Sequence, residues 1–527
     1  MIGRWRRASV DAAPAAGRAA PIDAAVFGWC RVCGSELGPG TARCDGCGSA
    51  RPLACRRPTR VLPELALSAR SVLSARQRHV GLGLAALLVL GLVIMPIGTL
   101  TALIAVATAA YLAVLVDRLR MFWRSLGHAD TLVISDAEAR AIPDAELPHY
   151  TILVPAYREP EVIGPLLDSL SRIEYPTDRL HVQLLFEADD GETIAAARKA
   201  APGSCVEMVL VPPSEPRTKP KACNVGLARA CGRFITIYDA EDRPDPLQLR
   251  RAVVAFRQLP EQVACLQAKL SYHNADQNLL TRWFTAEYAL WFGQLLPALV
   301  SRDAPLPLGG TSNHFRRKVL VELGGWDAFN VTEDADLGIR LHRRGYRTRV
   351  LESTTLEEAN SDAVNWVKQR SRWYKGYLQT WLLHVRQPRL LLSELGLGGF
   401  VSFNLFVGGT PLLAIVNPMF WGLTASWFLG RPAFIESLFP AWLYYVSLVC
   451  LALGNFTFLY TSLVSARALG HPSLVLAAIL SPFYWILMSI AALKALVQLI
   501  VAPSFWEKTV HGLDRVPAVT HGRRAGA

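Results

Sequence analysis

The 527-residue sequence predicts a multi-domain membrane protein in which an α/β domain lies between segments apolar enough to cross a bilayer. Three observations predict this class. Hydrophobic residues make up 51% of the chain, a high share for a soluble protein, and they gather in blocks. Between the blocks, short apolar runs alternate with segments of helical periodicity, and several runs end in acidic residues. Near the N-terminus, two Cys-x-x-Cys-Gly turns predict a metal-binding module.

The N-terminal region divides into three predicted parts. Residues 1–26 are rich in Ala and Arg, which predicts a disordered N-terminus, and residues 57–79 form a basic linker. Between them, residues 27–56 suit a zinc ribbon with a tetrahedral thiolate site, for which redox cysteines or an iron site are the alternatives. Such a ribbon is more often a structural or docking module than a catalyst. The predicted zinc ligands are Cys30, Cys33, Cys44 and Cys47.

Charge and cysteine usage bear on the cellular location. The formal net charge of +12 is compatible with nucleic-acid binding, but basic residues lie beside the apolar blocks, as they do at the cytoplasmic ends of membrane helices. We therefore expect no nucleic-acid partner. The other six cysteines are scattered and show no pairing pattern, which is typical of a reducing compartment. We expect the N-terminus and the central domain to be cytoplasmic.

Residues 80–116 are almost wholly apolar, with one interruption at Pro96-Ile97-Gly98. This length fits two membrane crossings joined by a tight turn. Arginines flank both outer ends, which places both ends on the cytoplasmic side by the positive-inside rule. The segment is therefore predicted to be a transmembrane hairpin.

The central segment, 148–385, shows the alternation of strands and helices that builds a parallel sheet covered on both faces. Three short apolar runs, 150–155, 181–186 and 233–238, predict buried strands. Acidic clusters follow the second and third runs. Ligands bind at the carboxyl ends of the strands in such sheets, so the clusters mark the predicted site.

Beyond the central domain, residues 398–502 are predicted to form transmembrane and interfacial helices. The apolar blocks are 398–429, 439–464 and 473–502. The first is long for one crossing and short for two, and the third contains Lys494 and suits a partly interfacial helix. Residues 503–527 are predicted to be a cytoplasmic tail, which requires an even number of crossings after the central domain.

An acidic turn, Asp239-Ala240-Glu241-Asp242, directly follows the third predicted strand. Carboxylate oxygens at this edge suit Mg²⁺ or Mn²⁺, which can neutralise a diphosphate leaving group and keep coordination positions open. A solvated acidic turn is the alternative, because Asp and Pro crowd this loop. Asp239, Glu241 and Asp242 are therefore the candidate ligands of a divalent metal.

Other side chains near the predicted strand ends suit a nucleotide. Lys221 lies just before the helix that leads into the third strand, where it can act as a point charge for phosphate. An ordinary surface charge run is the alternative. Tyr157 and Glu159, after the first strand, can grip a nucleoside by stacking and hydrogen bonding together with Asp189-Asp190.

A further acidic group, Thr332-Glu333-Asp334, begins an amphipathic helix. Thr332 suits the N-cap, and the helix dipole favours carboxylates in the first turn. A base at this place would take the proton of an acceptor hydroxyl as that hydroxyl attacks. Because a cap and a base are compatible roles, Asp334 is the candidate base, with Glu333 beside it.

Gln369, Arg372 and Trp373 lie on a later predicted helix that carries further aromatic residues. Such side chains can stack on sugar faces and bind diphosphate, and they can equally anchor an amphipathic helix at the bilayer surface. We expect both roles.

Taken in order, these motifs resemble the membrane-embedded, processive family-2 glycosyltransferases related to bacterial cellulose synthase, over roughly residues 80–510. The resemblance implies a nucleotide-sugar-binding domain of the GT-A, Rossmann-like type. It also implies roles for single residues. Asp189 would contact the uracil side, Asp239 and Glu241 the metal and diphosphate, Asp334 would be the base, and Gln369, Arg372 and Trp373 would hold the acceptor end.

The sequence departs from the family in two places. The metal motif is usually Asp-x-Asp, so either Glu241 or Asp242 reaches the metal here. Typical cellulose synthases also lack an N-terminal zinc ribbon. In addition, Ser504–Thr509 is loosely similar to the mobile lid that covers the nucleotide in the family.

The resemblance implies an inverting hexosyltransferase that polymerises a β-glycan exopolysaccharide, most simply a glucan, and moves it across the bacterial plasma (inner) membrane. Expected partners are UDP-glucose or a similar nucleotide sugar, the growing β-glycan chain, the lipid bilayer and a protein that the ribbon recruits. One alternative is a non-processive enzyme that transfers a sugar to a lipid phosphate carrier. Another is an inactive membrane scaffold that recruits partners through the ribbon. The Gln-x-x-Arg-Trp motif favours polymerisation, and the intact carboxylates argue against the scaffold.

Overall fold

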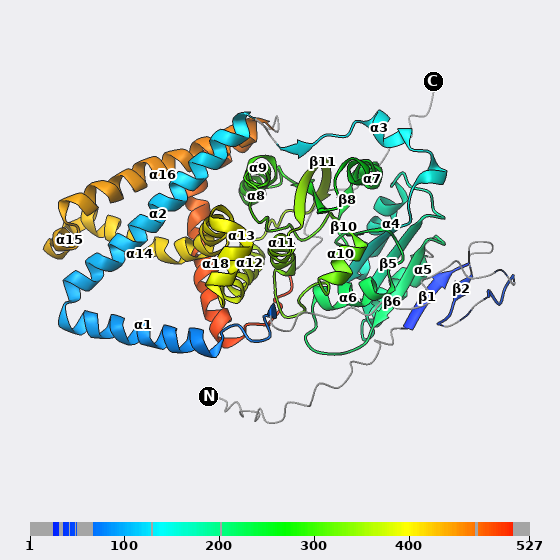
Figure 1. Cartoon of the computed structure of the whole chain (residues 1–527), viewed down its shortest axis with the longest axis horizontal. Coiled ribbons are helices and arrows are strands. Elements are labelled where there is room, and N and C mark those ends of the chain that lie inside the picture. Colours follow the sequence, from blue (N-terminus) through cyan, green and yellow to red (C-terminus); the bar gives the residue numbers. More distant parts are fainter. Residues whose placement is uncertain are drawn as a thin grey trace, which may run out of the picture.

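The computed structural model describes residues 25–30, 35–39, 41, 43–47, 49, 67–127, 130–200, 203–468 and 473–509. An α/β domain occupies one half of the molecule, and long helices extend from one side of it (Figure 1). Cys33, a predicted zinc ligand, lies outside the described residues.

One mixed sheet forms the centre of the α/β domain, with the strand order β2-β1-β6-β5-β4-β7-β10-β9-β11-β3, and β8 pairs with β11 beside this path. Strands β6, β5, β4 and β7 are mutually parallel; the sequence predicted β4, β5 and β7 as parallel strands but did not predict β6. Strand β10 is antiparallel to both of its neighbours, which the sequence did not predict because a buried four-residue strand carries no signal of its direction. The bounds are β1 (Ala25–Trp29), β2 (Glu36–Leu37), β3 (Thr131–Leu132), β4 (Tyr150–Ala156), β5 (Leu180–Glu187), β6 (Val206–Val211), β7 (Phe234–Ile237), β8 (Arg243–Pro244), β9 (Val263–Tyr272), β10 (Asn313–Arg316) and β11 (Arg347–Glu357).

Helices cover both faces of the sheet because its strands are apolar on both sides. In β4, Ile152 and Val154 belong to one hydrophobic cluster, which includes α4 and α7. Leu153, between them, points to the other face and joins the cluster of α6, α9 and α11. The bounds are α3 (Asp136–Ala141), α4 (Ile163–Ser171), α5 (Gly191–Ala200), α6 (Lys219–Arg229), α7 (Gln248–Gln258), α8 (Leu279–Leu290), α9 (Leu296–Ser301), α10 (Arg317–Glu322), α11 (Glu333–Arg343) and α12 (Ala363–His384).

Five helical segments among the described residues are long and apolar enough to cross a membrane: 75–94, 96–125, 388–430, 441–467 and 481–501. The first two are separated at Met95, and Pro96 takes the first position of the second helix, where its missing N–H costs nothing. The bounds are α1 (Ala75–Ile94), α2 (Pro96–Gly127), α13 (Pro388–Phe403), η5 (Asn404–Gly408), α14 (Gly409–Gly430), α15 (Ala433–Leu438), α16 (Ala441–Ala468), α17 (Ser473–Ile479) and α18 (Ser481–Val501).

The long helices have two orientations. Helices α1, α2, α14 and α16 extend away from the α/β domain, whereas α18 lies across their bases beside α12 (Figure 1). Helix α18 packs on both α12 and α14, and α16 packs on α2. The chain therefore leaves the α/β domain along α14 and returns along α16 before α18 begins.

The N-terminal cysteine segment is joined to the sheet. Strand β1 pairs with β6, and the Trp29 side chain is buried in the domain core. Ala25 and Val26 therefore belong to a strand and not to a disordered N-terminus, because the edge of β6 offers backbone partners that periodicity in so short a run does not reveal. Cys231 also differs from expectation, because it forms a disulfide, whereas the scattered cysteines of the sequence showed no pairing pattern.

Candidate active site

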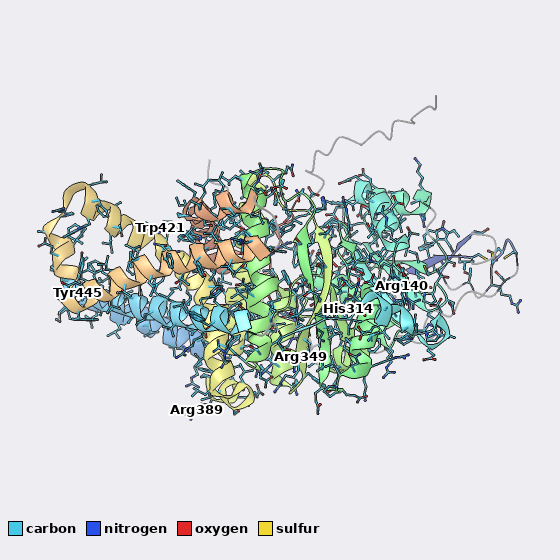
Figure 2. All side chains as sticks on the ribbon, turned by 90° about the horizontal axis from the view of Figure 1, so that it is seen from above. Arg140, His314, Arg349, Arg389, Trp421 and Tyr445 are labelled. Atoms are coloured by element: carbon cyan, nitrogen blue, oxygen red, sulfur yellow. The ribbon has the colours of Figure 1, made fainter. Side chains whose placement is uncertain are left out.

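A cavity of about 970 Å³ opens at the edge of the sheet where β4 and β7 end. Its lining begins with Tyr157 and Glu159, which follow β4, and with Asp239 and Glu241, which follow β7. The cavity continues past α11 and α12 and between membrane helices as far as Trp421, which lies among the helices far from the sheet (Figure 2). The two strand ends meet because β4 and β7 are parallel neighbours.

The acidic turn after β7 divides its carboxylates between the cavity and the protein interior. Asp239 and Glu241 line the cavity. Asp242 is 1% exposed and accepts hydrogen bonds from the Asp239 backbone N–H, at 2.8 Å, and from the Thr311 hydroxyl. The prediction of Asp242 as a metal ligand therefore disagrees with the structure, because this carboxylate folds back to hold its own turn.

Lys219 takes the place that the sequence suggested for Lys221. The Lys219 ammonium contacts the Asp239 carboxylate and donates to the Gly310 carbonyl at 2.8 Å. Burial alone would lower the pKa of Lys219, but the charges of Asp239 and Glu333 raise it above its usual value, so the group stays cationic. Lys221 instead forms an ion pair with Glu187 at 2.9 Å. Positions two apart on a helix face nearly opposite directions, so both lysines cannot reach the cavity.

Glu333 and Asp334 begin α11, and both side chains line the cavity. Burial is the main reason that the pKa of each carboxyl group is raised; the charge of Asp334 adds to the rise for Glu333, and the charge of Asp239 adds to the rise for Asp334. The Asp334 carboxylate accepts a hydrogen bond from the Ala335 backbone N–H at 2.8 Å and faces Gly310. Thr332 stands at the N-cap position, but its side chain makes no capping hydrogen bond.

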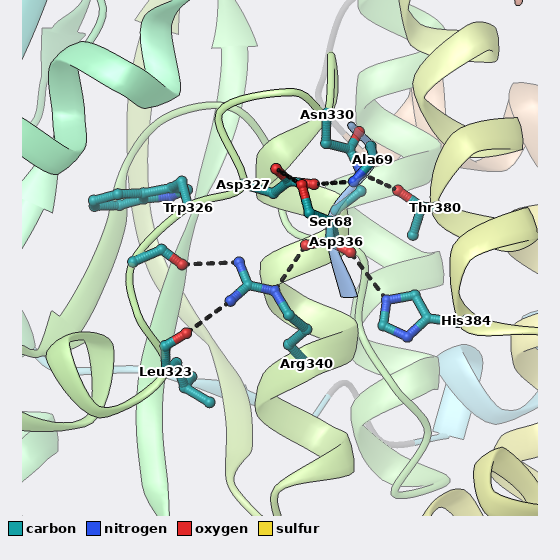
Figure 3. A network of polar contacts seen from close by, with 12 residues as sticks. Ser68, Ala69, Leu323, Trp326, Asp327, Asn330, Asp336, Arg340, Thr380 and His384 are labelled. Atoms are coloured by element: carbon teal, nitrogen blue, oxygen red, sulfur yellow. Dashed lines mark hydrogen bonds and ion pairs between the residues drawn. The ribbon is translucent and has the colours of Figure 1, made fainter. Parts of the chain in front are cut away.

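A buried network fixes α11 relative to its surroundings (Figure 3). Asp336 accepts from Arg340 at 2.7 Å and lies 3.0 Å from the His384 ring nitrogen on α12. Arg340 donates to the carbonyls of Leu323 and Gly325. Since these contacts anchor α11 on two sides, they also fix the position of Asp334 at its first turn.

The loops after β4 and β5 carry the residues that the sequence analysis assigns to nucleoside binding. Asp189 forms an ion pair with Arg217 at 2.6 Å, and Arg217 lines the cavity. Asp190 is 4% exposed and accepts from the backbone N–H groups of Arg158 and Thr193. The prediction that Asp190 binds substrate therefore disagrees with the structure, because its oxygens already hold the two loops together.

Helix α12 brings Gln369, Arg372 and Trp373 to the cavity wall, as the sequence suggested. The segment after α18 lies against them. The Arg372 guanidinium stacks on the Trp506 ring at 4.6 Å, and Lys508 pairs with Glu159 at 3.2 Å. Residues 506, 508 and 509 line the cavity, so the segment that is similar to a lid lies beside the nucleotide side of the site.

Sequence reasoning missed several cations that line the cavity, among them Lys219 and Arg118. Lys219 belongs to the same basic run as Lys221. Because residues two positions apart point to nearly opposite sides of a helix, the sequence could have indicated that only one of the two lysines reaches the site. Arg118 was interpreted as a flanking charge of a membrane hairpin, and only the packing of α2 against the α/β domain brings it to the site.

The donor atoms fit the two metal sites that the sequence predicts, one for Mg²⁺ or Mn²⁺ and one for zinc. Asp239 and Glu241 offer carboxylate oxygens at the cavity wall, which are the ligands that Mg²⁺ and Mn²⁺ prefer. Among the described residues, Cys30, Cys44 and Cys47 place their sulfur atoms within 4.8 Å of one another, a spacing and donor type that suit zinc.

Comparisons with known proteins agree with this geometry. Residues 148–376 match the family described as glycosyltransferase like family 2. The probable glycosyltransferase YdaM of Bacillus subtilis is 30% identical over 236 residues, which are 44% of this chain and 56% of that protein. The beta-monoglucosyldiacylglycerol synthase of Synechocystis is 27% identical over 417 residues, 76% of this chain and 81% of that protein.

A solved mannosyltransferase from Pyrobaculum calidifontis, in complex with GDP-Man and Mn²⁺, aligns with 76% of this chain and 99% of its own, at 19% identity and a TM-score of 0.49. The match to YdaM spans little more than half of that relative's length. Residues 148–376 are therefore similar to glycosyltransferase like family 2, and in the structure they fold around a mixed α/β sheet.

Proposed function

We propose that this protein transfers a sugar, with inversion, from a nucleotide sugar to a hydroxyl group of a lipid that enters its site from the bilayer. One observation carries the proposal. The cavity that is lined by Asp239, Glu241 and Asp334 continues without a break between helices α2, α14, α16 and α18. The relative from Synechocystis, which aligns over 76% of this chain, is named as a beta-monoglucosyldiacylglycerol synthase.

The donor would occupy the sheet edge. Asp239 and Glu241 would hold Mg²⁺ or Mn²⁺, which neutralises the diphosphate of the leaving nucleotide when bound. The cationic Lys219 and Arg372 face the same carboxylates and suit the diphosphate charge. Tyr157 and Glu159 lie where the nucleoside would stack and hydrogen-bond.

Asp334 would act as the general base. In a single displacement, the acceptor oxygen forms the new bond to the anomeric carbon while the bond to the diphosphate breaks, and the acceptor proton passes to Asp334. The raised proton affinity that burial gives Asp334 suits this transfer. Holding both reactants in one closed cavity supplies the orientation.

The membrane end of the cavity suits an apolar chain. Its lining on α14 and α16 is dominated by large apolar side chains, and sugar hydroxyls buried there would lose hydrogen bonds to water. Helix α16 packs on α2 and α14 packs on α18, with the cavity between the two pairs. These lining residues include Leu413, Phe420, Leu423, Phe428, Leu448, Leu451 and Phe458.

Processive synthesis of a β-glycan from UDP-glucose is the second candidate. It is favoured by Gln369, Arg372 and Trp373 at the cavity wall and by Trp421 and Trp427 deeper in the cavity, because indole rings stack on sugar faces. In this case the cavity between the helices would hold the growing chain instead of a lipid.

One experiment separates the two candidates. The purified chain, in vesicles with Mg²⁺ or Mn²⁺, is incubated with each radiolabelled UDP- or GDP-sugar in turn. We expect label in the organic phase as a glycolipid that carries one sugar. High-mass, water-insoluble label would instead establish polymerisation, and label in neither fraction with any donor would contradict both.

The arrangement of the helices supports a topology in the bacterial plasma membrane. Helices α1, α2, α14 and α16 would cross it, and α18 would lie at the cytoplasmic interface beside the catalytic domain (Figure 1). The segment after α18 contacts Tyr157 and Glu159, so it must lie on the same side as the active site. An even number of crossings satisfies this requirement.

We further propose that Cys30, Cys44 and Cys47 hold a structural zinc ion, with Cys33 as the fourth ligand predicted from the sequence. The cluster follows directly on β1, whose pairing with β6 joins it to the catalytic sheet. Its outer surface would remain available to a protein partner.

A further inference from the structure

Arg118 lies in the cavity at the boundary between the catalytic domain and the membrane helices. On α2, Thr108, Tyr111, Leu115 and Arg118 all line the cavity, at spacings of three, four and three residues that place them on one face of the helix. Arg118 is the member nearest the catalytic domain. Its guanidinium group stacks on the Phe406 ring at 4.7 Å.

The carboxylates near Arg118 are bonded to other cations. Glu287 accepts 2.8 Å and 2.5 Å bonds from the Arg370 guanidinium and a 2.7 Å bond from the Tyr484 hydroxyl. Asp117 accepts from Arg302 at 2.6 Å.

Within the described part of the chain, Arg118 has no hydrogen-bond acceptor, although its charge faces a largely apolar cavity. Charges withdrawn from water are normally paired. An anion at this place would supply the missing partner.

Tyr377 connects Arg118 with the catalytic end. Its hydroxyl is close enough to interact electrostatically with both Asp334 and Arg118, and it lines the same cavity. Tyr377 is therefore within reach of both the base Asp334 and Arg118, and the cavity that these three residues line continues into the apolar space between the membrane helices. An acceptor that fits this arrangement has a hydroxyl at one end, an anionic group next and an apolar chain last.

We propose that Arg118 binds the phosphate of the acceptor, and that the acceptor is a lipid whose hydroxyl-bearing head group is joined to its chain through phosphate. This inference rests on the proposed transfer to a lipid. Arginine suits the role because its planar fork can donate two hydrogen bonds to one phosphate. Both a glycerophospholipid with a polyol head group and a polyprenyl-phosphate-linked sugar have this chemistry.

Binding is tested without the sugar donor, so that the result does not depend on catalysis. The purified full chain is titrated with dioctanoyl phosphatidylglycerol and with dioctanoylglycerol, which has a hydroxyl but no phosphate. We expect the phosphate lipid to bind at least about tenfold more tightly, R118Q to lose this preference and R118K to keep part of it. A parallel titration with farnesyl-phosphoryl glucose distinguishes the two classes of lipid. Tighter binding of phosphatidylglycerol would indicate a glycerophospholipid acceptor, and tighter binding of farnesyl-phosphoryl glucose would indicate a polyprenyl-phosphate-linked sugar.

R120Q is the matched control, because Arg120 is an exposed arginine on the same helix and its loss removes the same charge. Three results would each overturn the inference. The wild type would bind the two lipids equally, or R118Q would keep the preference for the phosphate lipid, or R120Q would lose that preference as fully as R118Q. Failure of the proposed function has a different signature. The phosphate preference would then remain Arg118-dependent, while no donor transferred sugar to any lipid.

Discussion

Burial gives the carboxyl groups at the start of α11 a proton affinity that a surface aspartate lacks. Glu333 is 5% exposed, and for it as for Asp334 desolvation is the main reason that the pKa is raised. Below its raised pKa, Asp334 is protonated and cannot accept the acceptor proton. Transferase activity should therefore fall on the acid side at a higher pH than an exposed aspartate would give.

The first prediction concerns Asp334→Asn. The amide keeps the size of the side chain but cannot take a proton, so kcat should fall by about 10²–10⁴. Donor binding should change little, and isothermal titration with the nucleotide measures it. A variant that keeps near wild-type kcat would show that another group is the base.

The second prediction compares the two lysines of α6. Lys219→Gln should weaken nucleotide binding by roughly tenfold or more, because its ammonium faces the carboxylates at the diphosphate end. Lys221→Gln is the matched control, since Lys221 does not line the cavity and its ammonium is bound by Glu187. Titration of both variants with the nucleotide gives the comparison, and the opposite ranking would restore Lys221 as the phosphate ligand.

At the scale of elements, the site depends on how closely α12 approaches α11. A Cβ atom at Gly376 would lie 2.3 Å from the Thr332 hydroxyl oxygen, which is too close for any real contact. Glycine at this position therefore lets the helix with Gln369 and Arg372 pack against the turn before Asp334. His384, farther along α12, lies 3.0 Å from Asp336 on α11 and fixes the same pair of helices (Figure 3).

The third prediction is that Gly376→Ala lowers both stability and activity. Overpacking of this kind costs about 1–3 kcal/mol, and the shift of α12 should raise the KM for the donor. Gly164→Ala is the control, because a Cβ atom there meets no atom within 4 Å. Thermal unfolding and steady-state kinetics measure the effects, and equal behaviour of the two variants would show that the close approach is not needed.

The fourth prediction concerns the cysteine cluster. Elemental analysis should find about one zinc ion per chain, and the double variant Cys44→Ser with Cys47→Ser should lose it. Because β1 carries the cluster and pairs with β6, the loss should also speed amide hydrogen exchange in β6. Cys450→Ser, in helix α16, should keep the zinc. Bound iron in place of zinc, or zinc retained by the double variant, would contradict the proposed site.

At the scale of the whole molecule, the active site faces two environments. At the sheet edge carboxylates and cations line the cavity, and the same cavity continues among helices that are long and apolar enough to cross a membrane. None of the residues of α1 is buried against the rest of the protein, so the apolar side chains of this helix are available to lipid. Under the proposed function, this arrangement would let a water-soluble donor and a membrane-bound acceptor meet at one set of carboxylates.

The fifth prediction tests the membrane topology. Alkaline phosphatase fused after Arg431, at the far end of α14, should be active because this end would lie outside the cytoplasm. Fluorescent protein fused after Thr509 should fluoresce, since this segment contacts the catalytic domain. A phosphatase that is inactive after Arg431 would show that α14 does not cross, and α18 would then have to be assigned again.

The sequence alone determined the features that depend on local pattern. Apolar runs predicted β4, β5 and β7, and the acidic turns that end two of them predicted the site at the sheet edge, because parallel strands end together. Composition predicted the membrane segments, since length and apolarity are sufficient for this. The α/β class followed from the alternation of apolar runs and helices, and the mixed sheet confirms it.

Only the tertiary structure decided which polar side chain faces the cavity. Asp242 and Asp190 fold inward to hold loops, and Lys221 pairs with Glu187, although each lies within three residues of a group that lines the cavity. Direction within a turn or helix depends on long-range packing and not on local pattern. Arg118 shows the same limit, because its place in the cavity results from the contact between α2 and a domain far along the chain.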